Sequence, residues 1–459
     1  MIRLFRVSIP TSVLVLILSD TVIITACYVA ALFLALNQLL DPWFYLRFEN
    51  GWLQVALVVA FIQTGLYFMD WYEDLGLKST ILLMNRLCTL LGVAFLAQAL
   101  IGYSNATELQ LPQWSMAYGS LFVLVTISSW RSVFFAVIRR ALPDNRLLFV
   151  GMSPSARKTV KYLSEKSNIG YAVVGYLDSS DVFPGVPYLG LPEELKSVAK
   201  TLQVTTVVFD QTREELGYGL LDLRSSGLKV EEAAQFYEMV FGRVSLSDLR
   251  PAQVLLEEHP SARRINTSFQ GIYSFLLGCV GLVLFAPIML TVLVLVKLTS
   301  PGPAIYRQQR VGKNGSLFYL YKFRSMYIDA EARSGPVWAT KNDPRITPLG
   351  RWLRKLRLDE LPQFFNVIRG EMALAGPRPE RPEFCALLEK KIPFYNQRHI
   401  VKPGITGWAQ VNHKYTETIE DTATKLEYDL YYVKHVAPAL DAYIIFHTLK
   451  VMVLSRGAQ

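Results

Sequence analysis

The sequence has little cysteine and histidine, and neither residue type is arranged for chemistry. Its four cysteines lie far apart, and Cys27, Cys88 and Cys279 fall inside long apolar runs. Thiols at such places behave as small apolar side chains, so the pattern excludes a disulfide framework and a zinc site of closely spaced cysteines. The five histidines are also not spaced as metal ligands, and we assign none a catalytic role.

Glycine is missing where a dinucleotide-binding fold needs it. The stretch Asn145 to Val254 alternates predicted strands and helices, which is typical of a small parallel α/β unit. Its first turn begins at Gly151, but the second and third glycines of the G-x-G-x-x-G motif are absent, which argues against a bound pyrophosphate. Tyr162 and Lys166 match the Tyr-x-x-x-Lys pair of short-chain reductases. They follow the first strand directly, so we interpret them as solvent-facing helix residues.

Charged residues are scarce over several long stretches of the chain. Apolar residues make up 51% of the sequence. Four apolar runs are long enough to cross a bilayer core of about 30 Å as helices. They lie at roughly 13–36, 52–69, 81–101 and 115–138. We therefore expect a bundle of four transmembrane helices.

Basic residues flank this bundle on both sides. Arg3 and Arg6 precede it, whereas Arg139, Arg140 and Arg146 follow it. The positive-inside rule then places both ends in the cytoplasm, which agrees with an even number of crossings. No small-residue cleavage site follows the first run, so we interpret that run as an anchor rather than a secretion signal.

A fifth apolar run, at about 272–296, differs from a simple membrane crossing. Basic residues flank both of its ends: Arg263 and Arg264 before it, and Lys297, Arg307 and Arg310 after it. Pro287 stands in mid-run, where it removes a helix hydrogen bond and favours a sharp bend. These features predict a re-entrant hairpin that enters and returns on the same side. The alternative, a kinked span, would put the rest of the chain outside the cytoplasm.

The net charge of +9 is compatible with nucleic acid, an anionic membrane surface or a phosphate-bearing substrate. Lys and Arg gather beside the apolar runs and in the last third of the chain. This distribution suits lipid headgroups and phosphates better than a DNA groove, so we expect no nucleic acid.

The last third contains an adjacent pair of carboxylates, Asp359 and Glu360. Neighbours on a helix point about 100 degrees apart, so they cannot face each other as an acid pair. One carboxylate can hold Mg²⁺ while the other attacks phosphorus. Phosphoryl transfer also needs cations around one point. Candidates in Pro- or Gly-punctuated turns are Lys322, Arg324, Arg345, Arg378 and Arg398.

These residues belong to several long motifs that follow one another in the last third of the chain. They are SPGPAIYRQQRVGKNG, YKFRSM, DPRITPLGRWLRKLRLDELPQFFNVIRGEMALAGPRP and KPGITGWAQVN. Together they resemble the monotopic phosphoglycosyl transferases, a family of bacterial sugar transferases. The resemblance covers about 190 residues, from Asn266 to the C-terminus. The whole chain is similar to the large exopolysaccharide-initiating subgroup, the undecaprenyl-phosphate glycosylphosphotransferases.

The resemblance implies a two-step reaction. Asp359 would attack the sugar-bearing phosphate of a UDP-hexose, release UMP and keep the phosphosugar, while Glu360 binds Mg²⁺. Polyprenyl phosphate would then take the phosphosugar. Two departures from the family stand out: Ala286 replaces the serine that many members have before the hairpin proline, and Lys414 replaces an arginine. Lys414 keeps the positive charge but loses the bidentate fork for a phosphate.

We therefore expect a membrane protein of α plus α/β class. Its predicted parts are a four-helix transmembrane bundle (1–142), a Rossmann-like α/β module (143–255) and a mixed α/β catalytic domain with the re-entrant hairpin (256–459). We expect a homodimer in the bacterial inner membrane, with the catalytic domain facing the cytoplasm. The segment from Asp441 to Arg456 either lies flat on the membrane or packs on the domain.

Two alternatives from other functional classes stay open at this point. A membrane-bound nucleotide-sugar dehydratase or epimerase also joins four helices to a Rossmann fold, although the missing glycines argue against it. A noncatalytic scaffold of a polysaccharide assembly complex is the other, and the intact Asp359 and Glu360 pair argues against that.

Overall fold

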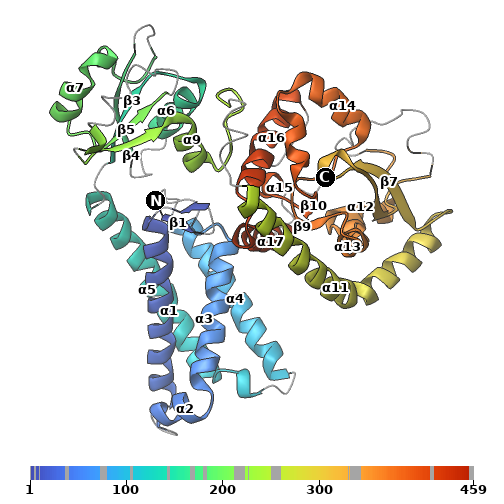
Figure 1. The fold of residues 1–459 in the computed structure, drawn as a ribbon. Coiled ribbons are helices and arrows are strands. Elements are labelled where there is room, and N and C mark those ends of the chain that lie inside the picture. The colour runs from blue at the N-terminus through green and yellow to red at the C-terminus, as the bar shows by residue number, and fades with distance from the viewer. Residues whose placement is uncertain are drawn as a thin grey trace. The chain divides into compact units, whose positions relative to one another are not determined.

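A computed structural model gives the fold of the chain (Figure 1). It describes residues 2–4, 7–9, 11–36, 41–72, 80–103, 107–141, 145–165, 171–178, 183–210, 223–225, 227–249, 260–328, 330, 343–413 and 418–453. Arg6, Lys166 and Lys414, which the sequence analysis named, lie outside these residues. The chain divides into two compact units, which we describe separately. The first comprises Met1–Ile2, Ile9–Leu147 and Tyr162–Val174, and the second comprises Arg3–Ser8, Leu148–Lys161 and Gly175–Gln459.

The first unit is a helical bundle. Its long helices are α1 (Thr11–Leu36), α3 (Gly51–Phe68), α4 (Thr80–Tyr103) and α5 (Gln113–Ala141). Shorter elements accompany them: α2 (Pro42–Phe48) and η1 (Thr107–Leu109). The short strands β1 (Ile2–Leu4) and β2 (Val7–Ile9) lie mostly within Arg3–Ser8, which belongs to the second unit. The Asp41 side chain caps α2 by accepting a hydrogen bond from the Trp43 N–H at 3.0 Å. The four long helices lie where the apolar runs predicted helices.

Four described helices are long and apolar enough to cross a membrane. They contain the segments Val13–Leu36, Gly51–Phe68, Met84–Tyr103 and Ile265–Thr299. Helix α5 is not among them, although a fourth crossing was predicted there. It contains several serines and Arg131, which is buried and donates a hydrogen bond from Nη2 to the Trp71 carbonyl. These polar residues lower the mean hydropathy of α5, so its length alone does not mark a span.

A four-stranded sheet forms the core of the α/β module. Its strands are β3 (Asn145–Val150), β4 (Tyr171–Leu177), β5 (Thr206–Phe209) and β6 (Lys229–Glu232), in the order β4-β3-β5-β6. Its helices include α6 (Pro154–Glu165), α7 (Leu195–Thr201) and α9 (Ala233–Phe241). Leu148, Val150 and Val207 are buried between the layers. Tyr162, expected to face solvent, is half-buried on α6.

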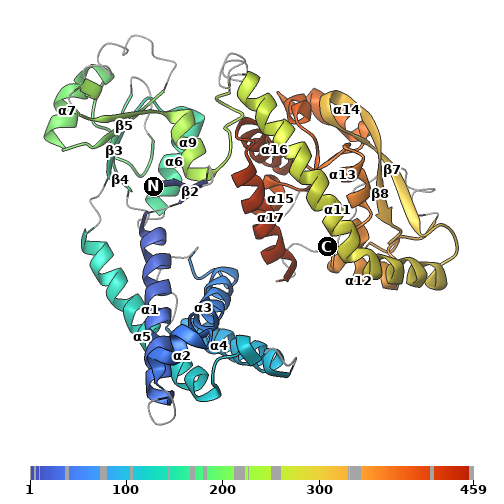
Figure 2. The ribbon, with the colours of Figure 1, turned by 60° about the horizontal axis from the view of Figure 1, so that its bottom comes forward.

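The fifth apolar run forms part of a single helix, α11 (Pro260–Thr299), with Pro287 inside it. Figures 1 and 2 show α11 as one continuous, bent ribbon. A proline has no N–H to donate and its ring crowds the preceding turn, which accounts for a bend without a break. Most of the apolar side chains on α11 are exposed. The described residues 260–299 therefore hold a bent helix and no reverse turn.

The region after α11 begins with a hairpin of antiparallel strands, β7 (Ile305–Val311) and β8 (Leu317–Phe323). A short parallel pair, β9 (Ala373–Ala375) and β10 (Gly404–Thr406), lies in its interior. The helices are α12 (Pro348–Lys355), α13 (Gln363–Ile368), α14 (Pro382–Lys391), α15 (Trp408–Asn412), α16 (Ile419–Lys434) and α17 (Pro438–Val453). A capping box between Thr418 and Asp421 begins α16.

Helix α17 contains most of the segment that was expected either to lie flat on the membrane or to pack on the domain. Leu440 and Ile444 are buried in the main apolar core of this region, so one face of the helix packs on the domain. Phe446 and Leu449 are exposed on another face. The helix is therefore a packed element that also presents apolar side chains at the surface.

Asn366 gives a test of this fold. It is fully buried on α13. Its Oδ1 accepts a hydrogen bond from the Tyr321 N–H at 3.1 Å, and its Nδ2 donates to the Tyr319 carbonyl at 2.7 Å. Asn366→Ala leaves both backbone groups of β8 unpaired, so we expect it to lower the free energy of unfolding by roughly 2 kcal/mol. Thermal unfolding in detergent measures this loss.

The control is Asn396→Ala, because Asn396 is exposed and donates a hydrogen bond to another exposed side chain, Glu389. Equal unfolding midpoints for the two variants would contradict the structural role of Asn366.

Candidate active site

A tight turn presents the two adjacent carboxylates. Helix α12 ends at Lys355, and Arg357 then takes a left-handed backbone conformation with φ of 54°. The next three residues form the 3₁₀ turn η5 (Leu358–Glu360), in which the half-buried Leu358 packs against a small apolar core. Asp359 and Glu360 are 7% and 8% exposed. The turn therefore buries two neighbouring carboxylates, which is costly unless cations compensate.

Three cationic side chains lie within 4 Å of the Glu360 carboxylate. Its Oε1 accepts hydrogen bonds from Lys322 Nζ at 3.0 Å and from Arg378 Nη2 at 2.6 Å. Its Oε2 lies 3.7 Å from Arg357 Nη1. Burial alone would raise the pKa of Glu360, but the charges of Arg378 and Lys322 outweigh it and hold that pKa well below its usual range. Glu360 is therefore an ionised carboxylate.

Asp359 differs from its neighbour although both are buried. Within the described part of the chain, no group donates a hydrogen bond to its carboxylate. Burial raises the pKa of Asp359; the nearby charge of Lys322 opposes this rise, and the charge of Glu360 adds to it. Arg354 on α12 is a further cation close enough to act on it. A carboxylate without donors keeps its lone pairs free for attack on an electrophile.

Lys322 reaches this point from strand β8, where it lies opposite Tyr306 of β7. Burial lowers the pKa of Lys322, and the charge of Glu360 partly offsets the change. The antiparallel hairpin thus holds a cation beside the carboxylate pair. Lys322 is one of the cations that the sequence predicted around the carboxylate pair, and in the structure it bonds Glu360.

Arg378 reaches Glu360 from the turn Gly376–Glu380, which close backbone contacts define. The Gly376 N–H donates to the Thr406 carbonyl at 2.9 Å, and the Gly404 N–H donates to the Pro377 carbonyl at 3.1 Å. A Cβ on Gly404 would lie 2.1 Å from the Gly376 nitrogen, which no side chain tolerates. The glycines of the KPGITGW motif thus let the backbone of β10 press against the turn that carries Arg378.

Internal ion pairs hold the same turn from behind. The Arg398 Nη2 donates to the Arg378 carbonyl at 2.8 Å and to Asp429 Oδ2 at 2.7 Å. Lys425 Nζ donates to Glu380 Oε1 at 2.7 Å, and Arg310 Nη1 lies 3.6 Å from Glu380 Oε2. Burial would raise the pKa of Glu380, but Lys425 and its other cationic neighbours lower it to about 2. Arg398 therefore fixes the backbone of the turn rather than facing the carboxylate pair.

Two other predicted cations are also engaged within the protein. Arg324 Nη2 donates to the carbonyl and the hydroxyl of Ser300, both at 2.8 Å, and so ties β8 to the loop after α11. Arg345 pairs with Asp343 two residues earlier, at 2.5 Å. The hydrogen bonds from Arg345 lower the pKa of Asp343 to about 2. Of the predicted cations, Lys322 and Arg378 contact Glu360, and Lys414 lies outside the described residues.

Sequence reasoning missed Arg354 and Arg357 as site residues. Both belong to the basic stretch directly before the carboxylate pair. Their nearness in sequence was the signal, because Arg354 stands on the last turn of α12 and Arg357 directly precedes η5. Glu380, Lys425 and Asp429 were missed too, since a supporting ion pair has no local sequence pattern.

A divalent metal has few protein ligands here. Within the described residues, no three or more His, Cys, Asp or Glu side chains gather as a metal-binding group. Among the described residues, Glu360 Oε2 accepts no hydrogen bond, and Arg357 Nη1 lies 3.7 Å from it. A single ionised carboxylate fits Mg²⁺, which prefers hard oxygen ligands and is often bound through only one or two carboxylates.

Comparison with known proteins identifies the family of the chain. The sequence profile of the bacterial sugar transferases matches residues 265–455. A relative from Escherichia coli (strain K12), named UDP-glucose:undecaprenyl-phosphate glucose-1-phosphate transferase, is 31% identical over 370 residues, which are 78% of this chain and 79% of the relative. The chain belongs to the bacterial sugar transferase family. Its apolar helices mark this family member as a membrane protein.

Two more relatives show how the family varies in length. An Aeromonas hydrophila protein named UDP-N-acetylgalactosamine-undecaprenyl-phosphate N-acetylgalactosaminephosphotransferase is 42% identical over 233 residues, or 50% of this chain and 54% of the relative. This sugar transferase thus spans about half the length of that relative. A Rhizobium leguminosarum exopolysaccharide production protein is 42% identical over 182 residues, which are 39% of this chain and 90% of the relative. The family region can therefore make up nearly a whole protein.

Gly404 gives a test of the close backbone contact in this sugar transferase. Gly404→Ala should force β10 away from Gly376 and displace the turn that carries Arg378, at a cost of about 2 kcal/mol or more. We expect a lower thermal midpoint and faster hydrogen exchange in peptides covering 373–380. Gly271→Ala is the control, because nothing lies within 4 Å of a Cβ at Gly271. If both variants exchange like the unmodified protein, this packing argument fails.

Proposed function

We propose that the protein transfers a sugar 1-phosphate from a UDP-hexose to undecaprenyl phosphate, or another polyprenyl phosphate, and releases UMP. This is the first membrane step of exopolysaccharide or capsule synthesis. The observation that carries the proposal is the pairing of a donor-free carboxylate, Asp359, with a carboxylate held by cations, Glu360. The names of the Escherichia coli and Aeromonas relatives describe this class of reaction.

In the first step, an oxygen of Asp359 attacks the phosphorus that bears the sugar. The bond from that phosphorus to the bridging oxygen breaks, and UMP leaves with the electron pair. The product is a phosphosugar on the aspartate as a mixed anhydride. In the second step, an oxygen of the lipid phosphate attacks the same phosphorus, which restores the free carboxylate and yields a polyprenyl diphosphosugar.

The cations at the site suit both steps. Lys322 and Arg378 lie within hydrogen-bond distance of Glu360, next to the attacking residue, and Arg354 and Arg357 stand nearby. Their charges neutralise phosphate oxygens as the new bond forms, in a site from which water is largely excluded. We therefore propose Lys322, Arg354, Arg357 and Arg378 as the phosphate-facing cations, and Arg324, Arg345 and Arg398 as residues that hold their surroundings.

We also propose that Glu360 would hold Mg²⁺, and the ion would supply positive charge beside the phosphates when it is bound. The protein's share is to keep Glu360 ionised, which its pairs with Arg378 and Lys322 do.

We propose a re-entrant path for α11 and a cytoplasmic position for the catalytic residues. The bent course of α11 (Figure 1) and its internal Pro287 support this path, as do the basic residues on both sides of the apolar stretch. A cytoplasmic face gives access to UDP-hexoses, and the inner membrane supplies the lipid phosphate. We also propose that the protein is a homodimer.

The dehydratase or epimerase alternative gains no support from the α/β module. The N-terminus of α6, where a cofactor pyrophosphate would bind, already holds a carboxylate of the chain: the Ser155 N–H donates to Asp248 Oδ2 at 2.8 Å. For a noncatalytic scaffold, the buried and charge-compensated pair at 359 and 360 would have no purpose.

Asp359→Asn tests the proposed chemistry. An amide is a poor nucleophile for phosphorus, so we expect the transfer of radiolabelled sugar phosphate to lipid to fall by roughly a thousandfold or more. With lipid phosphate withheld, the unmodified protein should show a covalent phosphosugar adduct by intact mass spectrometry, and the variant should show none.

Glu389→Gln is the control for this test, because Glu389 is an exposed carboxylate on α14. It should transfer sugar phosphate at the normal rate. Full activity in Asp359→Asn would end the proposal.

A further inference from the structure

Helix α16 contacts the active-site turn through one of its faces. Lys425, Asp429 and Tyr432 are spaced at i, i+4 and i+7, so they share a side of the helix. Lys425 bonds Glu380, and Asp429 holds Arg398, which in turn bonds the Arg378 carbonyl. The Tyr432 hydroxyl donates to the Ala375 carbonyl at 2.9 Å. This face therefore fixes the backbone that carries Arg378 toward Glu360.

The opposite face of α16 contacts helix α9 of the α/β module. Glu427 and Lys434 are seven residues apart and share that side. Lys434 Nζ donates to both carboxylate oxygens of Glu238 on α9, at 2.8 and 3.0 Å. The Tyr237 hydroxyl donates to Glu427 Oε2 at 3.1 Å. Burial would raise the pKa of Glu238, but its bonds with His435 and Lys434 lower it.

A short segment that follows α9 extends this contact. We call residues 242–248 the coupling strap. The Val244 N–H donates to the Glu427 carbonyl at 3.1 Å, and the Leu246 N–H donates to Glu427 Oε1 at 3.3 Å. Val244 itself is buried in the apolar core that contains Trp408. The strap thus contributes to the core around α16.

Trp408 of the KPGITGW motif also holds the strap. Its Nε1 donates to the Gly242 carbonyl at 2.6 Å, and its ring stacks on Tyr431 of α16 at 5.8 Å. Gly242 has φ of 63°, and an added Cβ would lie 3.1 Å from the Trp408 ring. A glycine is therefore needed where the strap leaves α9.

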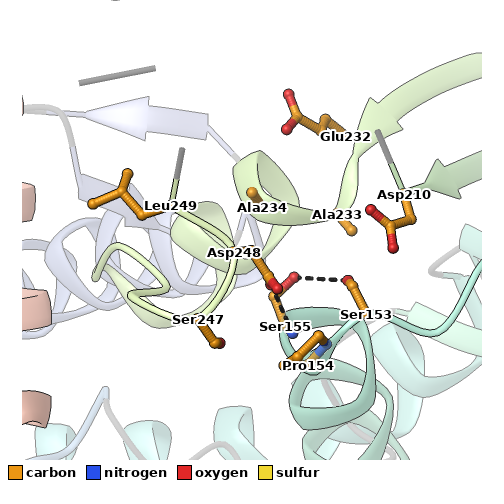
Figure 3. Close-up of a pocket in the computed structure, with 10 residues that line it drawn as sticks. All are labelled: Ser153, Pro154, Ser155, Asp210, Glu232, Ala233, Ala234, Ser247, Asp248 and Leu249. Carbon is orange, nitrogen blue, oxygen red and sulfur yellow. Dashed lines mark hydrogen bonds between the residues drawn. The ribbon is translucent and has the colours of Figure 1, made fainter. Parts of the chain in front are cut away.

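The far end of the strap is anchored in the α/β module. Asp248 accepts a hydrogen bond at Oδ2 from the Ser155 N–H in the first turn of α6, at 2.8 Å. Figure 3 shows Asp248 pointing toward that turn, at the rim of a pocket of about 210 Å³. A helix N-terminus favours a negative group, and here the chain supplies its own. The strap therefore links the first helix of the module to α16.

We propose that α9 and the coupling strap are a positioning element for the transfer reaction, with Glu238, Lys434 and Glu427 as positioning residues. They hold one face of α16 so that its other face keeps Gly376–Glu380, and hence Arg378, in register with Glu360. This assigns the α/β module a role in aligning the active site. The inference rests on the proposed function.

The size of the expected effect follows from where the contacts of Glu360 lie. Lys322 and Arg378, which bond Glu360, both belong to the catalytic domain itself and not to the α/β module. The element therefore refines a geometry that the catalytic domain already forms. We expect its loss to slow the reaction several-fold rather than abolish it.

The experiment uses the full-length protein in detergent and three variants of the ion pair: Glu238→Lys, Lys434→Glu, and the two combined as a charge swap. Hydrogen exchange is followed in peptides covering 373–380, and UMP release gives kcat and KM for the nucleotide sugar. Each single variant should exchange about fivefold faster there and lose about fivefold in kcat, with little change in KM. The charge swap should recover most of both losses.

Lys200→Glu is the matched control, since Lys200 is an exposed lysine on α7 of the same module. It should change neither measurement. The inference is overturned if the single variants exchange like the control, or if the charge swap recovers nothing. Exchange does not depend on catalysis, so altered exchange in a protein that releases no UMP would defeat the proposed function and leave the coupling intact.

Discussion

The ion pairs of Glu360 are the interaction on which the active site depends. A carboxylate buried to this degree is stable only with opposite charge beside it, and Lys322 and Arg378 provide that charge from two separate segments. The same cations serve the neighbouring Asp359, which has no hydrogen-bond donor of its own in the described structure. One residue of the pair is thus held still and ionised, and the other is left open to react. The division of labour between two adjacent acids arises from their surroundings.

The rest of the domain supports those two cations. Lys322 is placed by a regular antiparallel hairpin, which needs only strand pairing. Arg378 stands on an irregular turn, and such backbone needs partners for its polar groups. Glycines at 376 and 404 admit the closest approach, while Arg398 and Lys425 bond the turn from behind. The buried pair of Arg398 and Asp429 is costly to desolvate, so its value lies in fixing the backbone in one arrangement.

The supporting helix α16 links this turn to the α/β module. Its two faces carry different sets of contacts, one with Gly376–Glu380 and one with α9 and the coupling strap. The α/β module lacks the glycines for a dinucleotide, and hydrogen bonds through α16 connect it to the segment that carries Arg378. The carboxylate of Asp248 completes the helix end that a phosphate would otherwise occupy, so the connection is built from groups of the chain itself.

The sequence by itself determined the long helices, the carboxylate pair and the family, because apolar runs and adjacent motif residues are local signals. It also indicated a bend at Pro287, since proline acts on its own helix. It could not decide which cations face the acids. Arg378 and Arg398 look alike in sequence, yet one bonds Glu360 and the other bonds Asp429, 31 residues away. Only tertiary structure made that distinction, because a guanidinium pairs with whichever carboxylate the fold brings near it. The link from Asp248 to Ser155 spans 93 residues, and no periodicity or motif marks such a contact.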